Sequence, residues 1–217
     1  MAQLDTISEH NNRPSHTKAT REDWIMAARD VLVSEGVGEV KILTLAAQLD
    51  VARSSFYWYF NTRSDLLNAL LADWESRNTD CIIEKCASPA ENLSHAICHF
   101  FECFIDPDLF DPGLDFAVRE WSRRDSNVRA KIDAADARRL SAIQDLFTRF
   151  GLDAYEADAR ARILYFMQLG YHALDVNETL AQRLERIEGY LLGFSGLEAD
   201  LHAVEQFKDR VSVYHNI

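Results

Sequence analysis

Apolar residues recur every three or four positions along most of the chain, which is the spacing of an amphipathic α-helix. In the first such stretch, Ile25 and Leu32 lie on one face of the helix. Thr20, followed three residues later by Asp23, is typical of a helix start with a capping box, and Gly36 is typical of a helix end. We therefore expect the first helix to run from Thr20 to Gly36.

Two short helices and a longer one are expected next. The short helices cover residues 42–49 and 52–57, and the dipeptide Asp50-Val51 separates them. The longer helix begins at Ser64, because a serine hydroxyl is a good acceptor for the N–H groups of a first helical turn.

The rest of the chain has helical spacing as well. The helices expected here cover residues 90–105, 115–124, 127–150, 154–175 and 179–194. For residues 197–214 the pattern leaves one more helix and a looser tail both open. No stretch of useful length alternates between apolar and polar residues, and no segment is repeated. We therefore expect an all-α fold.

Composition supports this fold class and excludes several others. Eight Gly and four Pro in 217 residues are few for a turn-rich β protein, and 47% apolar residues are too many for a disordered chain. The longest apolar runs are far shorter than the ~20 residues that span a bilayer. Asp5 and Glu9 lie where a signal peptide would be apolar, so we expect a cytoplasmic protein without a membrane partner. The four cysteines follow no zinc spacing and are expected to be free thiols.

Charge is distributed unevenly along the chain. The net charge is −12, but residues 1–63 contribute 7 Lys or Arg against 8 Asp or Glu, a net −1. The remaining −11 belongs to residues 64–217. The overall acidity therefore does not exclude nucleic-acid binding by the N-terminal segment.

The two short helices have the pattern of a helix-turn-helix. Leu45 and Leu49 are spaced for burial, and Val51 is expected to fill the turn. Before the next apolar anchor, Phe56, come outward-facing residues that can approach base edges, namely Arg53, Ser54 and Ser55. Arginine can contact guanine with two hydrogen bonds, and serine can pair with several bases.

Residues 55–67, SFYWYFNTRSDLL, together with Leu45-Ala46 and Val51, resemble the DNA-binding region of the TetR family of bacterial repressors. The resemblance covers roughly residues 20–70. It implies a flexible arm over residues 1–19, a three-helix DNA-binding head over residues 20–64, and a helical domain over residues 65–217 that binds an effector and forms a dimer.

The resemblance also implies which residues bind DNA. Arg63, where the family usually has Lys, and Tyr59 would lie near phosphates. The full set is Lys41, Thr44, Arg53, Ser54, Ser55, Tyr57, Trp58, Tyr59 and Arg63. Three positions depart from the family: Asp50 replaces the turn Gly, Ala52 replaces a Ser or Thr cap, and Lys41 stands near a usual Thr. Asp tolerates the left-handed conformation, so the turn is expected to persist.

The C-terminal helices contain candidates for a dimer interface and an effector pocket. The expected interface residues are Met167, Gly170, Leu184, Ile187, Leu191 and Phe194, with burial inside one protomer as the alternative. The expected pocket residues are His95, His99, Cys103, Arg119, Trp121, Tyr165, Gln168 and His172. His95 and His99 share a helix face that suits either a metal or an ordinary packed core, and we expect neither a metal nor a cofactor. Arg119 either pairs with other charges or holds an anionic ligand.

Together these features predict a homodimeric repressor that binds a palindromic double-stranded DNA operator and is released by a small-molecule effector. An activator or a ligand-independent regulator of the same fold remains an alternative. A helical protein-interaction module without DNA binding is a second one. An enzyme is not expected, because the sequence lacks a nucleophile elbow, a phosphate-binding glycine loop and a metalloprotease helix.

Overall fold

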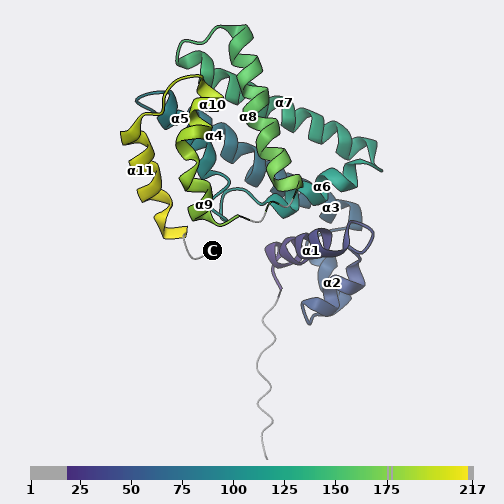
Figure 1. Ribbon diagram of the computed structural model, residues 1–217. Coiled ribbons are helices and arrows are strands. Elements are labelled where there is room, and N and C mark those ends of the chain that lie inside the picture. The colour runs from purple at the N-terminus through teal and green to yellow at the C-terminus, as the bar shows by residue number, and fades with distance from the viewer. Residues whose placement is uncertain (1–18, 175, 177, 215–217) are drawn as a thin grey trace, which may run out of the picture.

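Every regular element is a helix in the computed structural model, which describes residues 19–174, 176 and 178–214 (Figure 1). The expected all-α fold is confirmed, whereas the expected arm lies outside the described residues except for Ala19. No helix in the described part is long and apolar enough to cross a membrane. The α-helices are α1 (Arg21–Glu35), α2 (Ile42–Gln48), α3 (Arg63–Glu75), α4 (Cys81–Ala87), α5 (Leu93–Glu102), α6 (Pro112–Ser122), α7 (Ser126–Arg149), α8 (Ala154–Ala173), α9 (Leu180–Glu185), α10 (Ile187–Ser195) and α11 (Leu201–Val211). The shorter elements are the 3₁₀-helices η1 (Arg53–Trp58) and η3 (Ser212–Tyr214) and the π-helical turn η2 (Ser76–Asp80).

Helix α1 starts where the sequence analysis expected it, but α3 does not. Thr20 and Asp23 form the expected capping box, and Gly36 ends α1 with a φ of 85°. At α3 the N-cap is Thr62 and not Ser64. The Thr62 hydroxyl accepts a hydrogen bond from the N–H of Asp65 at 3.2 Å, because the backbone at Thr62 is extended and this first-turn N–H has no carbonyl four residues earlier to donate to.

Three other segments differ from the expected helices. The segment expected over residues 52–57 is the 3₁₀-helix η1, whose i to i+3 bonds suit so short an element. The helix expected over residues 179–194 is divided into α9 and α10 at Arg186, where the backbone leaves helical geometry. Residues 197–214, which the pattern left open, contain α11.

The apolar side chains form two clusters. The first surrounds Trp24 and Phe56 in the head and extends to Leu114 on α6 and Ile132 on α7. The second fills the body between α4, α5, α7, α8, α10 and α11, and it contains all four cysteines as buried free thiols. Helix α3 crosses the expected boundary at residues 64 and 65 without interruption and continues through η2 into α4. The head is therefore attached to the body by this helical run and by shared packing on α6 and α7 (Figure 1).

Candidate nucleic-acid interface and ligand pocket

The turn between α2 and η1 is tight and left-handed. Asp50 has a φ of 52°, a conformation that Asp accepts more readily than most residues. The N–H of Val51 then donates to the carbonyl of Ala46 at 3.0 Å, and the Val51 side chain packs against the head cluster. The turn predicted from the sequence therefore forms although Asp replaces Gly.

The element after this turn presents aromatic and cationic side chains to solvent. Tyr57 is 48% exposed and Trp58 is 62% exposed, whereas Phe56 between Trp24 and the head cluster is fully buried. The Arg53 guanidinium donates to the Tyr57 hydroxyl at 3.1 Å and lies 5.9 Å from the centre of its ring. One buried ring thus anchors η1, while the exposed side chains project from it.

Part of the predicted DNA-binding set lies on this exposed surface. Lys41 pairs with Glu39 at 2.8 Å, and both are exposed. The exposed members of the set are Lys41, Thr44, Arg53, Ser54, Tyr57 and Trp58. Leu43 and Gln48 are exposed on α2 as well and were not among the predicted residues. The four-residue spacing from Thr44 to Gln48 places both on one face and could have identified Gln48.

The other three predicted residues make contacts inside the head. The Ser55 hydroxyl is buried and donates to the carbonyl of Ala52 at 2.8 Å. The Tyr59 hydroxyl donates to the carbonyl of Ala19 at 2.9 Å. These two hydrogen bonds hold η1 and the segment that leads into α1. Ser55 was expected to face outward, and that prediction is wrong.

Arg63 also has internal partners. Its Nε donates to the carbonyl of Val40 at 2.6 Å, and its Nη2 donates to the carbonyl of Val37. Both carbonyls belong to the loop between α1 and α2, which has no regular structure of its own. Arg63 thus ties this loop to α3, a role that its spacing in the sequence did not reveal.

The predicted pocket residues do not gather in one pocket. Cys103 is buried and its thiol donates to the carbonyl of Cys81 at 3.5 Å. His95 Nε2 lies 2.7 Å from the side-chain oxygen of Gln206, and Trp121 packs into the head cluster. The buried His99 Nδ1 has no hydrogen-bond partner among the described residues. Within the described ranges, no three His, Cys, Asp or Glu side chains are arranged to hold a metal.

Arg119 and Tyr165 belong to a buried polar network. Arg119 donates one hydrogen bond to Asp115 at 2.8 Å and two to Asp136 at 2.7 and 2.9 Å. Arg139 donates to the other oxygen of Asp115 at 3.0 Å and to the Tyr165 hydroxyl at 3.1 Å. The alternative in which Arg119 pairs with other charges is therefore correct.

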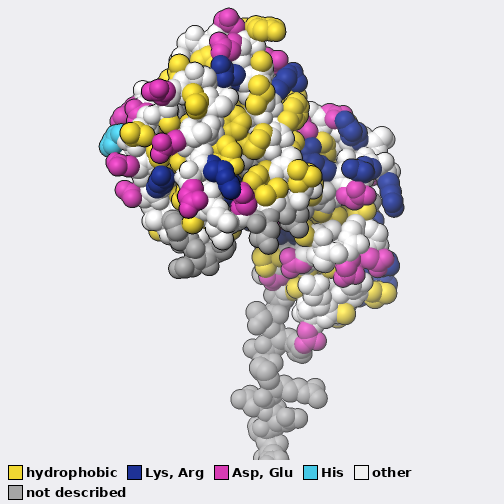
Figure 2. Space-filling view, viewed as in Figure 1, with side chains coloured by type: hydrophobic (Ala, Val, Ile, Leu, Met, Phe, Trp, Pro, Cys, Tyr) yellow, Lys and Arg dark blue, Asp and Glu magenta, His cyan; other side chains and the backbone are white. Residues whose placement is uncertain are grey.

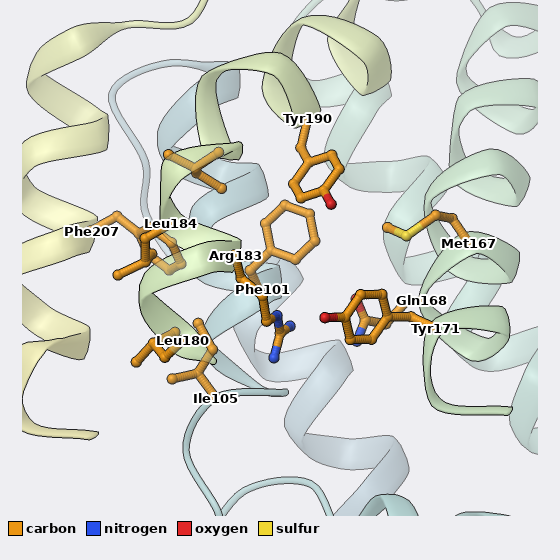
Figure 3. Close-up of a pocket in the computed structure, with 11 residues that line it drawn as sticks. Phe101, Ile105, Met167, Gln168, Tyr171, Leu180, Arg183, Leu184, Tyr190 and Phe207 are labelled. Atoms are coloured by element: carbon orange, nitrogen blue, oxygen red, sulfur yellow. The ribbon is translucent and has the colours of Figure 1, made fainter. Parts of the chain in front are cut away.

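An apolar pocket does exist, between α5, α8, α9, α10 and α11 (Figure 3). Its lining residues are Phe101, Ile105, Met167, Gln168, Tyr171, Leu180, Arg183, Leu184, Ile187, Tyr190 and Phe207. Gln168 is the predicted pocket residue that lines it, and His172 contacts it indirectly, 2.8 Å from the Gln168 amide nitrogen. Burial lowers the pKa of His172 to about 4, so its ring is neutral at pH 7.

The expected dimer residues mostly face this pocket and the body core. Leu184, Ile187, Leu191 and Phe194 are buried within the protomer, and Met167 lines the pocket. The alternative of burial inside one protomer therefore describes this stripe. The exposed face of the same two helices holds different apolar residues, Ile163 and Phe166 on α8 and Leu192 on α10.

Comparison with known proteins agrees with this architecture. Residues 25–70 match the model for bacterial regulatory proteins of the tetR family. Over 58 residues the chain is 36% identical to an uncharacterized HTH-type transcriptional regulator, TtgW, and 34% identical to the HTH-type transcriptional regulator SrpR, both of Pseudomonas putida. These matches span 27% of this chain and only 43% and 27% of the two relatives.

The fold is shared over nearly the whole chain. The crystal structure of Mycobacterium smegmatis AmtR superposes with a TM-score of 0.59, covering 93% of this chain and 97% of AmtR at 19% identity. The likeness at this identity concerns the fold, while the head carries the sequence match. The helix-turn-helix geometry and the family match over residues 25–70 lead to one conclusion: the head of this chain is a helix-turn-helix of the tetR family of bacterial regulatory proteins, and the whole chain shares the fold of AmtR.

Proposed function

We propose that this chain is a homodimeric transcriptional repressor that binds a palindromic DNA operator in the bacterial cytoplasm and is released by a small-molecule effector. The observation that carries the proposal is the exposed Arg53, Tyr57 and Trp58 directly after the left-handed turn at Asp50. Arginine reads guanine with two hydrogen bonds, and tyrosine and tryptophan reach phosphates and sugars. The acidic body, net −11 over residues 64–217, would repel DNA and leave the head as the contact surface.

Dimer formation is supported by an apolar face on α8 and α10. Ile163 is 56% exposed, Phe166 51% and Leu192 49%, and hydrophobic side chains gather over α8 in the space-filling view (Figure 2). On the same helices, the space that a Cβ would occupy at Gly189 and Gly193 is open. Since no helix of this protomer uses that space, we propose that the helices of a second copy pack there, as in a four-helix interface.

The buried polar network supports the transmission of a conformational change from the pocket to the head. Met167 and Gln168 of α8 line the pocket, and one turn earlier Tyr165 donates to Asp136 at 2.7 Å. At the other end of the network, the indole N–H of Trp74 on α3 donates to Asp115 at 2.8 Å. We propose that a ligand-induced shift of α8 reaches α3 by these hydrogen bonds and changes the separation of the two heads.

The test is selection of duplexes from random-sequence DNA by the purified protein at moderate salt. We expect a palindrome whose half-sites lie about one helical turn apart, roughly 34–36 Å. Arg53→Ala is expected to lose roughly 10- to 100-fold in affinity and to relax one base position. The charge-matched Arg149→Ala, an exposed residue at the far end of α7, should bind like the wild type. If a folded protein enriches no palindrome, or if both variants behave alike, the proposal is wrong.

A further inference from the structure

The charged groups beside the apolar pocket do not balance. Glu178 accepts a hydrogen bond from Arg186 at 2.6 Å with one oxygen and from the Tyr171 hydroxyl at 2.8 Å with the other. Arg183, which lines the pocket, forms no ion pair and no side-chain hydrogen bond with any described residue. Among the described residues, two arginines and one glutamate therefore leave one positive charge at the pocket.

The position of Arg183 is uncommon for this chain. The protein has 35 Asp and Glu against 23 Lys and Arg, yet this half-buried guanidinium has no carboxylate partner in the described part. Its charged carbon lies 4.9 Å from the centre of the Tyr171 ring, which holds the group against the pocket wall (Figure 3). A guanidinium carries five N–H donors in a planar fork that matches a carboxylate, so these donors are available to a bound anion.

The apolar lining residues of the pocket favour a ligand with a small aromatic ring. Phe101, Phe207 and Tyr190 supply aromatic walls, and Leu180 and Ile187 supply aliphatic ones. As it stands, the pocket has room for about two ordered waters. An aromatic ring is larger than this, so it enters only if the lining side chains or α9 move outward, and a large drug-like molecule needs a wider opening still.

We infer that the pocket binds a small monocyclic aromatic carboxylate, with the ring between the aromatic walls and the carboxylate on the guanidinium of Arg183. This inference rests on the proposed effector function, because it names the chemical class of the effector. Gln168, Tyr171 and Tyr190 supply the other polar side-chain atoms of the lining. The neutral His172 behind Gln168 adds no second positive charge at pH 7.

The experiment uses the full chain and isothermal titration calorimetry with benzoate, the neutral isostere benzamide and the cation benzylamine. We expect benzoate to bind at least about tenfold more tightly than benzamide, since one charge-assisted contact separates them. Arg183→Gln should remove this preference, and Arg183→Glu should shift it to benzylamine. Arg149→Gln, which removes an exposed charge on the body, should leave the benzoate affinity unchanged.

The outcomes separate this inference from the proposed function. Equal binding of benzoate and benzamide, no benzoate binding up to its solubility limit, or an unchanged preference in both Arg183 variants would overturn the inference, whatever the protein does with DNA. If benzoate binds through Arg183 but leaves operator affinity unchanged, the ligand class is correct and release by the effector is wrong. Circular dichroism of each variant confirms that it is folded.

Discussion

Asp115 is the carboxylate that joins α3, α6 and α7 in the buried polar network. It is fully buried and accepts hydrogen bonds from Trp74, Arg119 and Arg139. Burial alone would raise the pKa of its carboxyl group, but the charges of Arg139 and Arg119 outweigh this effect and hold the pKa below its ordinary value. The carboxylate is therefore stabilised in its charged form only while both guanidinium groups remain beside it.

Asp115→Asn is expected to lower the free energy of unfolding at pH 7 by about 3–5 kcal/mol, because the fully buried Arg139 loses its nearest carboxylate and Arg119 keeps only Asp136. Urea denaturation measures this change. Asp133→Asn, which removes the exposed partner of Arg129, should cost less than about 0.5 kcal/mol.

The same carboxylate predicts a pH dependence. Since the pKa of Asp115 is lower in the folded than in the unfolded state, its contribution is complete above about pH 4 and is lost as the pH falls below that value. Urea midpoints measured from pH 6 to pH 3 should fall less steeply in Asp115→Asn than in the wild type. Parallel curves would contradict this assignment.

His172 predicts a second pH effect, at higher pH. Burial lowers its pKa to about 4, whereas an unfolded histidine titrates near 6.5. As the pH falls from about 6.5 towards 4, the unfolded chain takes up the proton first, so this contribution to stability is lost in that window. Urea midpoints of His172→Gln should change less between pH 7.5 and pH 5 than those of the wild type. A His172→Gln variant that keeps the wild-type slope would contradict this assignment.

At the scale of the elements, helix starts were predictable where a hydroxyl is followed three residues later by an acidic residue. Thr20 and Asp23 have this spacing and form a capping box. At α3 the sequence contains two hydroxyls, Thr62 and Ser64, and only Thr62 has an acidic residue, Asp65, at this spacing. The prediction that α3 begins at Ser64 was wrong because it overlooked this second capping box, in which the Asp65 carboxylate accepts from the N–H of Thr62 at 2.9 Å.

These two hydroxyls form a matched pair for mutation. Thr62→Ala removes the N-cap of α3 and is expected to cost about 1 kcal/mol of stability. Ser64→Ala changes an exposed position inside the helix, where alanine is the better helix former, and should be neutral or slightly stabilising. Thermal or urea unfolding of both variants measures the difference. A larger loss from Ser64→Ala would show that the cap is assigned to the wrong residue.

At the scale of the whole molecule, two features depend on contacts between distant segments. The pocket joins α5, α8, α9, α10 and α11, so its lining comes from residues up to 106 positions apart, Phe101 and Phe207. The apolar face on α8 and α10 is the complement of this pocket, because each helix turns one side inward and the other outward. The face that we propose for the dimer therefore lies on the helices expected from the sequence but consists of other side chains.

The dimer can be tested on this outward face. Phe166→Glu places a charge in the proposed interface and should convert the dimer to a monomer at micromolar concentration. Leu201→Glu on α11 changes an exposed leucine outside that face and should leave the dimer intact. Sedimentation velocity distinguishes the two states. A dimer that survives Phe166→Glu would place the interface elsewhere.

The sequence by itself determined the all-α fold class, the turn at Asp50 and the family of the head, because these depend on residues within a few positions of one another. Only the tertiary structure decided the partners of polar side chains. Arg63 bonds to loop carbonyls more than 20 residues away, and Arg119 closes a network with Asp136 and Tyr165. A buried guanidinium takes whichever acceptors the packing brings within about 3 Å, and periodicity along one helix carries no information about that choice.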